Sequence, residues 1–405
     1  MSVFENVKEG KTVDIQSLNI AYDEDPFENK VNLCTRSYRT ERGESWVLPV
    51  VRQAEKALLN EPETVECLSV FGLEKFYNAA TKLLLGGDSQ ALYEKRVLSL
   101  QTLSGSCSLR LSAELLVQKM GCKIFYVSSP AWENHILVFK SAGFEDFRRY
   151  RYWNANTRRL NFEGMLEDLE NAPAGSVIVL QPFAHNPTGC DPTHEQWAKI
   201  TDVLLSRKLI PVLDCAYHGM ISGEIEKDLW PVRYLISRRL ELFWCNTFTK
   251  CFGLYNERVG LLTCIVKTPE VIPRLKFQLN LFIRAAYSNP PLHGARIVAH
   301  ILTTPQLFQE WKDCLKKMSF RILEMRTNFR NALERYESPG KWEHITLQNG
   351  MSCYTGLTEQ QCMNLICQYH IYLQKSGRIN ITCLNFSNIE YVVKCINETV
   401  AKIPY

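Results

Sequence analysis

Residues 242–266 read LFWCNTFTKCFGLYNERVGLLTCIV, and this stretch carries the clearest structural signal in the chain. Its two apolar runs, 242–246 and 260–266, have the length and composition of buried strands. Lys250 lies between them among threonine and aromatic side chains, which solvate an ammonium group poorly. Poor solvation disfavours the charged form, and a neutral amine can form a Schiff base with an aldehyde. The stretch therefore predicts a strand that leads into a reactive lysine, followed by a second strand.

The same segment contains groups that bind anions. The hydroxyls of Thr247 and Thr249, together with the guanidinium of Arg258, would hold an anion beside Lys250. An aldehyde that carries a phosphate is a description of pyridoxal 5′-phosphate (PLP). Taken alone, the segment fits a surface lysine and arginine near a turn equally well, so the rest of the chain has to decide.

Composition and charge exclude several classes of protein. The chain has 405 residues, which favours a division into two domains with ample burial. Its hydrophobic content of 46% and charged content of 22% are ordinary for a soluble globular protein. A formal net charge of +4 over this length indicates neither a nucleic-acid partner nor a membrane partner. No apolar run approaches the roughly 18 residues that a membrane span requires.

The cysteines and the N-terminal residues indicate the cellular compartment of the protein. The chain contains 15 cysteines, but its first residues resemble neither a secretion signal nor an Arg-rich transit peptide. This combination indicates a reducing compartment. The spacing of Cys362 and Cys367 matches no zinc or redox motif. We therefore expect a cytoplasmic protein without a metal site.

Short apolar strands alternate with helical stretches after residue 49. Buried runs of this length at helix-sized intervals are typical of an α/β protein with a mainly parallel sheet. The predicted strands are residues 123–128, 176–181, 210–214, 242–246 and 260–266.

The pattern of predicted strands and helices changes near residue 320, where we place a domain boundary. Residues 305–336 have apolar side chains near helical spacing and predict one long amphipathic helix that links the two domains. Beyond it, short strands at 371–373 and 379–382 are mixed with helices at 359–369 and 389–402.

Polar residues follow several predicted strands, where ligands bind in open α/β sheets. Asn186 lies in a turn after the strand 176–181, and Asp214 and Tyr217 follow the strand that starts at residue 210. The turn 104–106, Ser-Gly-Ser, precedes a helical run and would offer backbone N–H groups to a phosphate. Each feature also has an ordinary structural explanation, such as a helix cap, a turn or a core residue.

Together, these residues supply what a pyridine cofactor requires. A carboxylate keeps the ring nitrogen protonated, donors meet the phenolic oxygen, an aromatic ring covers the face, and an anion site takes the phosphate. Asp214, Tyr217 and Trp132 have the right chemistry for the first three of these tasks. The combination favours PLP binding more strongly than any single residue does.

Long motifs in one order carry a resemblance to a known family. They are WVLPVV at 46–51, SPAWENH at 129–135, YRYW at 150–153, HNPTG at 185–189, FGLYNERVG at 252–260, SNPP at 288–291, GARIV at 294–298 and SGRIN at 376–380. With them, the chain resembles the aspartate aminotransferases, in their cytosolic animal type, along nearly its whole length. These are class I aminotransferases and PLP enzymes of fold type I.

The resemblance implies a fold and a domain plan. Fold type I has a large domain with a mainly parallel sheet covered by helices on both faces, and a smaller α+β domain. Residues 1–45 would form an N-terminal arm and the first part of the small domain. Residues 46–320 would form the large PLP-binding domain, and residues 321–405 the C-terminal small domain.

The resemblance also implies roles around the cofactor. Lys250 would hold PLP and move the proton, and Asp214 would pair with the ring nitrogen. Asn186 and Tyr217 would contact the phenolic oxygen, and Trp132 would stack on the ring. The catalytic set implied in this way is Lys250, Asp214, Tyr217 and Trp132, and the other cofactor-binding residues are Gly105, Ser106, His135, Asn186, Thr247 and Arg258.

Further roles concern the substrate. Arg378 would grip the α-carboxylate as a bidentate fork, and Arg284 would reach the side-chain carboxylate from the partner subunit of a homodimer with shared active sites. Trp132 and Asn186 would also line the substrate site, and Arg36 lies where it would add a contact. The implied reaction transfers the amino group between L-aspartate and 2-oxoglutarate, giving oxaloacetate and L-glutamate, and dicarboxylic amino acids and keto acids are the expected partners.

Three positions depart from the family pattern. Cys67 replaces a tyrosine that donates to the phosphate, Arg36 replaces a glycine over the substrate, and Ser352 replaces an aromatic wall. These departures leave two alternatives open beside a working aspartate aminotransferase. One is a PLP enzyme with a shifted substrate or reaction, and the other is a weakly active paralogue that serves as an interaction or structural protein.

Overall fold

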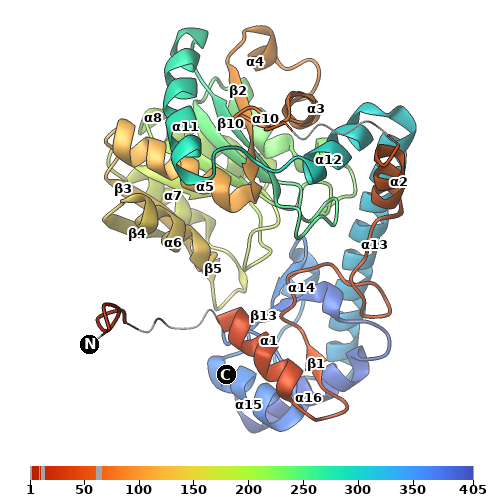
Figure 1. Ribbon diagram of the computed structural model, residues 1–405. Helices are drawn as coiled ribbons and strands as arrows, with labels where there is room; N and C mark the ends of the chain where they lie inside the picture. The colour runs from red at the N-terminus through yellow and green to blue at the C-terminus, as the bar shows by residue number, and fades with distance from the viewer. Residues whose placement is uncertain (1, 9, 11–13, 61–65, 405) are drawn as a thin grey trace.

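A seven-stranded sheet forms the centre of the larger part of the molecule (Figure 1). The computed structural model describes residues 2–8, 10, 14–60 and 66–404. Strand β10 is antiparallel to both of its neighbours, and all other neighbouring strands are parallel. The mainly parallel α/β sheet expected from the sequence is confirmed. Across the sheet, the strands are β2 (Val97–Leu103), β10 (Val259–Ile265), β9 (Leu242–Thr247), β8 (Ile210–Cys215), β7 (Val177–Leu180), β3 (Ile124–Ser129) and β4 (Asp146–Arg151).

The five predicted strands agree with β3, β7, β8, β9 and β10 to within one residue at either end. The apolar pattern does not predict β2, because buried Gln101 and Thr102 interrupt it. The amide of Gln101 is satisfied inside the protein, since it accepts from the N–H of Leu73 at 2.9 Å and donates to the carbonyl of Pro291 at 2.7 Å. A buried polar side chain whose donor and acceptor both have partners is tolerated inside a protein.

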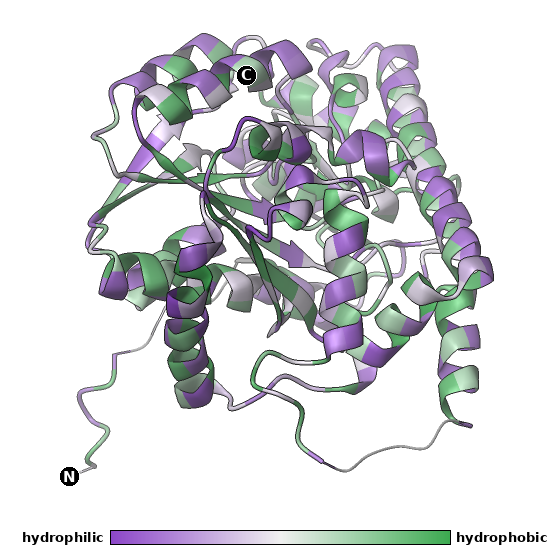
Figure 2. Ribbon diagram, turned by 90° about the horizontal axis from the view of Figure 1, so that it is seen from above, coloured by the Kyte–Doolittle hydropathy of each residue, from purple (hydrophilic) through white to green (hydrophobic). Residues whose placement is uncertain are grey.

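Helices cover both faces of the sheet because successive strand residues point to opposite sides. In β3, Phe125 and Val127 belong to one apolar cluster, and Tyr126 between them belongs to the other. Figure 2 shows the apolar strands inside and the polar faces of the helices outside. One cluster includes residues of α5 (Ser104–Glu114), α6 (Glu133–Ala142) and α11 (Ile272–Ala286). The other includes residues of α3 (Glu74–Leu85), α7 (Phe162–Glu170), α8 (His194–Ser206), α10 (Trp230–Ser237) and α12 (His293–Thr303).

The smaller part joins both ends of the sequence. Strand β1 (Val31–Asn32) pairs in parallel with β12 (Ile371–Tyr372), so the segment around β1 lies beside the C-terminal segment. Figure 1 shows α1 (Asp14–Glu24) beside the C-terminal helices. The other elements here are β11 (Ser352–Tyr354), β13 (Arg378–Asn380), α14 (His344–Leu347), α15 (Glu359–Tyr369) and α16 (Ile389–Lys402).

Helix α13 (Pro305–Arg335) runs beside both parts of the molecule (Figure 1). It begins with a proline at its first turn, where the missing N–H costs nothing, and it confirms the long helix predicted at 305–336. The domain boundary near residue 320 falls inside this helix and stays a prediction.

The remaining elements are short or peripheral. They are α2 (Pro49–Leu58), α4 (Gln90–Tyr93), α9 (Ile225–Asp228), β5 (Trp153–Asn154), β6 (Arg159–Leu160), a π-helical turn at Leu115–Lys119 and 3₁₀ turns at Pro269–Val271 and Ile381–Cys383. Within the described ranges, no helix is both long enough and apolar enough to cross a membrane. The same residues contain no group of three or more His, Cys, Asp or Glu side chains placed to hold a metal ion.

Candidate active site

The predicted site residues meet at one edge of the sheet. Asp214 lies near the end of β8, Lys250 follows the end of β9, and Asn186 follows β7. Because β7, β8 and β9 are parallel, their carboxyl ends share this edge, where ligands bind in open α/β sheets. The smaller part of the molecule adds Arg378 from β13.

Lys250 occupies a positively charged, weakly solvated position. Its side chain is half-buried, its Nζ donates to the backbone carbonyl of Arg36, and the same nitrogen lies 5.8 Å from the centre of the Tyr217 ring and 5.1 Å from that of Tyr255. Burial, followed by the nearby charges of Arg378, Arg36 and Arg258, lowers the pKa of Lys250 to about 7. A large fraction of this amine is therefore neutral and nucleophilic at physiological pH.

Asp214 is buried in a hydrogen-bonded setting. Its Oδ2 lies 2.8 Å from Nε2 of buried His135 and accepts from Nε2 of Gln181 at 3.4 Å. Trp132 packs edge-on against the His135 ring, with centroids 5.1 Å apart. Among the described residues, both of these hydrogen bonds go to Oδ2, so Oδ1 can accept from a further donor.

Three hydroxyls gather at the N-terminus of α5. Ser104 Oγ lies 2.8 Å from Thr247 Oγ1, which lies 2.5 Å from Thr249 Oγ1. Gly105 and Ser106 follow in the first turn of α5, whose N–H groups and dipole favour an anion.

The backbones of β10 and of the turn at Ser104 approach each other closely at this group of hydroxyls. A Cβ on Gly260 of β10 would lie 2.5 Å from the backbone of Ser104, so only glycine allows the strand and the turn to meet. Ser104 itself has a φ of 68°, a strained value for a side chain other than glycine. Burial, followed by the charge of Arg36, lowers the pKa of Arg258, whose Nη1 donates to the carbonyl of Tyr255 at 3.4 Å.

A second cluster joins the two parts of the molecule. Arg378 is 7% exposed, and its Nη2 donates to Ser352 Oγ at 3.2 Å. Ser352 in turn donates to Asn186 Oδ1 at 3.5 Å and hydrogen-bonds Tyr217. Burial raises the pKa of the Tyr217 hydroxyl, although Arg378 acts in the opposite direction.

The guanidinium of Arg378 is not fully satisfied within the chain. Its Nε is buried and has no hydrogen-bond partner among the described residues. A buried cation with a free donor is costly, and a carboxylate ligand would relieve that cost. The geometry therefore favours a ligand with a carboxylate at this point.

Other predicted residues lie at the margin. Arg284 is exposed on α11 and donates from Nη1 to Ser288 Oγ at 2.7 Å, a contact within its own segment and apart from the clusters above. Arg36 also has an exposed side chain, but its charge acts on Lys250 and Arg258. Cys67 is a free, exposed thiol.

Sequence reasoning did not single out Gln181, Tyr255 and Asp191. Gln181 contacts Asp214 and accepts from the N–H of Asn186 at 2.9 Å. The sequence feature that could have identified it is a polar residue at the end of a buried strand. Asp191 accepts from the N–H of Ala184 at 2.8 Å and so fixes the turn that carries Asn186. Tyr255 lies within the lysine motif, but only the folded chain brings its ring beside Lys250.

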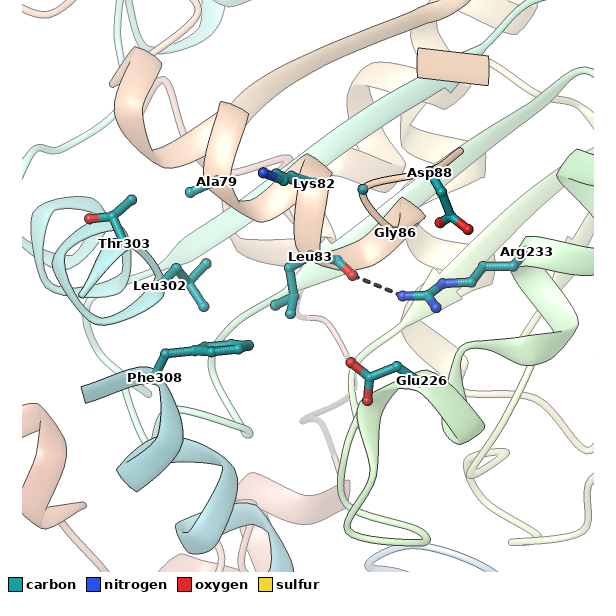
Figure 3. Close-up of a pocket in the computed structure, with 11 residues that line it drawn as sticks. Ala79, Lys82, Leu83, Gly86, Asp88, Glu226, Arg233, Leu302, Thr303 and Phe308 are labelled. Atoms are coloured by element: carbon teal, nitrogen blue, oxygen red, sulfur yellow. Dashed lines mark hydrogen bonds between the residues drawn. The ribbon is translucent and has the colours of Figure 1, made fainter. Parts of the chain in front are cut away.

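A cavity of about 640 Å³ lies apart from these clusters (Figure 3). None of the predicted site residues lines it. Arg233 in its wall donates to the carbonyls of Leu83 and Leu84, both at 3.0 Å, while Asp88 and Glu226 balance its positive charge. These contacts are those of a packed surface cleft rather than of a reaction centre.

Comparisons with known proteins agree with this geometry. The model of the family "Aminotransferase class I and II" matches residues 28–396. The chain is 46% identical to the cytoplasmic aspartate aminotransferase of Gallus gallus, covering 99% of both chains, and 44% identical to that of Caenorhabditis elegans, covering 100% of this chain and 99% of the relative.

Solved structures give the same result. The aspartate aminotransferase from Saccharomyces cerevisiae cytoplasm superposes with a TM-score of 0.96 at 38% identity, with 99% of each chain covered. An aromatic-amino-acid aminotransferase from Burkholderia pseudomallei, covalently bound to pyridoxal phosphate, superposes with a TM-score of 0.95 at 36% identity, covering 98% of this chain and 100% of the other. The matched fold is the one the sequence predicted, and the chain belongs to the class I and II aminotransferase family.

Proposed function

We propose that this protein is a PLP-dependent aspartate aminotransferase of the cytoplasm. It would transfer the amino group between L-aspartate and 2-oxoglutarate, giving oxaloacetate and L-glutamate. The observation that carries the proposal is the position of Lys250, with a pKa of about 7, beside a buried arginine, Arg378, whose Nε lacks a partner within the described chain. The names of the chicken and nematode relatives support both the substrate and the location.

The residues present fit PLP. The hydroxyl cluster at the start of α5, with Arg258, suits a phosphate, and Asp214 has one oxygen left for a protonated ring nitrogen. Trp132 beside His135 would cover the ring, and Lys250 would bind the aldehyde. When bound, PLP supplies the carbonyl that takes up the amino group and a ring that accepts the electron pair released at the substrate Cα.

The protein itself performs binding, orientation and proton transfer. Arg378 would hold the substrate α-carboxylate through Nε and Nη2, which fixes Cα in front of the lysine. Lys250 Nζ would then remove the proton from Cα. A base with a pKa near the operating pH combines the correct protonation state with sufficient basicity, which is the best compromise for this task.

We also propose a homodimer with shared active sites. Phe277 and Leu281 on α11 are 60% and 47% exposed, and Arg284 continues the same helix face at the i+3 position after Leu281. An apolar helix face in water favours a protein partner. Burying this face against a second copy would bring Arg284 toward the partner's substrate site, where it would pair with a side-chain carboxylate.

One observation favours an altered substrate range as a second candidate. The carbonyl of Arg36 accepts from Lys250, and the charge of Arg36 acts on the groups around it. The additional positive charge of Arg36 beside Lys250 would favour amino acids whose side chain carries more than one acidic group or a phosphate.

The test uses purified full-length protein loaded with PLP. The visible absorbance of the protein-bound cofactor is recorded before and after L-aspartate is added, and oxaloacetate is assayed in the same sample. Loss of the visible band together with oxaloacetate release supports the proposal. A protein that takes up no PLP contradicts it, and a band that responds to another amino acid but not to aspartate selects the altered substrate range.

A further inference from the structure

Ser352 lies at the junction between the two parts of the proposed site. It is the first residue of β11 and is 1% exposed. Its hydroxyl accepts from Arg378 Nη2 at 3.2 Å and lies 3.5 Å from Asn186 Oδ1, to which it donates. A hydroxyl has one proton and two acceptor lone pairs, so it makes both contacts at once. Ser352 thus connects the arginine of one part to the turn after β7 of the other.

Strand pairing sets the distance between Ser352 and Arg378. In the antiparallel pair of β11 and β13, Ser352 is opposite Asn380, and Arg378 is opposite Tyr354. Ser352 and Arg378 are therefore diagonal neighbours on one face, a separation that a long side chain spans. The contact follows from the register of the two strands and not from a chance rotamer on a loop.

A buried arginine on α13 holds the backbone of Ser352 in place. Arg326 is 1% exposed, and its Nη2 donates to the carbonyls of Ser352 at 2.5 Å and Gly350 at 2.8 Å. Its Nη1 donates to the carbonyl of Ile345 at 2.9 Å. The serine is thereby anchored from behind while its hydroxyl faces the site, an arrangement that restricts where the hydroxyl can lie.

We propose that Ser352 is a positioning residue for the substrate α-carboxylate. It holds one Nη2 proton of Arg378 and leaves Nε and the second Nη2 proton for the carboxylate, and it fixes this fork relative to Asn186. The inference rests on the proposed function, because it takes Arg378 as the carboxylate ligand. It predicts that any amino acid with an α-carboxylate depends on Ser352, whatever its side chain.

The first test measures binding without reaction. Succinate, a dicarboxylate with no amino group, is titrated into the PLP-loaded wild type and into Ser352→Ala, Ser352→Thr and Cys353→Ala by calorimetry. Loss of a bond to a charged group predicts a Kd about tenfold higher for Ser352→Ala. Ser352→Thr keeps the hydroxyl and should return to within about threefold of the wild type.

Cys353→Ala is the matched control. Cys353 is the next residue of β11 and is fully buried, so its truncation disturbs the same strand without touching the hydroxyl. Thermal unfolding of each variant shows that it is folded. An unchanged Kd in Ser352→Ala, or an equal rise in Cys353→Ala, overturns the inference.

The second test separates the two carboxylates. Aspartate and alanine share the α-carboxylate but differ in the side chain. Ser352→Ala should lower kcat/KM for both amino acids by the same factor, mainly through KM. A loss confined to aspartate overturns the inference, because Ser352 would then act on the side chain. A wild type that transaminates neither amino acid instead refutes the proposed function, so the two failures are distinguishable.

Discussion

The site has two regions that differ in how completely their polar groups are paired. The proposed cofactor floor comprises Lys250, Asp214, His135, Thr247 and Ser104, and each of these side chains has a hydrogen-bond partner within the protein. The proposed substrate rim comprises Arg36, Arg378, Ser352 and Arg284. Arg36 and Arg284 are exposed, and buried Arg378 has an Nε without a partner among the described residues. Under the proposed function, the floor would determine the type of reaction, whereas the rim would determine which molecule undergoes it.

The difference has a structural origin. The floor is attached to β8, β9 and α5, and both strands are paired on two sides within the seven-stranded sheet. The rim is attached to β11 and β13, which form a two-stranded sheet, and to the segments after β1 and on α11. Elements with fewer neighbours accept new side chains more easily, so substrate preference can change while the chemistry is retained.

The largest expected effect is loss of the floor amine. Lys250→Ala removes the amine proposed to bind PLP and move the proton, so kcat with aspartate should fall by at least about 10³-fold. The visible band of the bound cofactor should change in the same variant. A Lys250→Ala protein with a wild-type absorbance and rate would contradict the assignment of the floor.

The next effect concerns the buried carboxylate. Asp214→Asn keeps the shape but removes the charge that would hold a proton on the ring nitrogen, so kcat should fall by about 10²-fold with little change in KM. Ser222→Ala, in the turn before α9, serves as a control, since its hydroxyl donates to Asp228. Equal rates for Asp214→Asn and the wild type would place the electron-accepting role elsewhere.

Sequence reasoning reached the floor more completely than the rim. Lys250, Asp214 and Thr247 belong to apolar strands or follow them directly, so periodicity alone places them at one edge. Ser352 and Arg378 lie on short strands whose register depends on tertiary pairing, and no local pattern encodes the contact between them. The role of Arg326 could not be predicted for a related reason. It lies among the apolar positions of α13, and its carbonyl acceptors, Ile345 and Gly350, lie in a later part of the chain.

A stability measurement tests the floor in the absence of PLP. The pKa of Lys250 is about 7 in the folded chain against 10.5 as the ordinary value, so the unfolded chain binds more protons between these pH values. The contribution of Lys250 to stability is therefore most favourable above pH 10.5, and it is lost as pH falls toward 7. Lys250→Met should raise the free energy of unfolding at pH 7 by about 1–3 kcal/mol. Urea unfolding at pH 7 and pH 9 should show a larger gain at pH 7, and equal gains would contradict the lowered pKa.

The smallest expected effect comes from a substitution at the rim that changes the pKa of Lys250 in the floor. PLP uptake by the cofactor-free protein requires neutral Lys250, so its rate should rise with pH and reach its midpoint near the pKa of about 7. Arg36 is one of the cations that lower this pKa, so Arg36→Ala should move the midpoint upward and slow uptake at pH 7 by about two- to threefold.

Arg42→Ala removes an exposed arginine from the same N-terminal segment and should leave the midpoint unchanged. A midpoint that stays in place in Arg36→Ala would show that the side-chain charge at the rim does not tune the lysine. A shift shows instead that the departure at residue 36 reaches the chemistry, because its side-chain charge acts on Lys250 in addition to the hydrogen bond that Lys250 donates to the backbone carbonyl of the same residue.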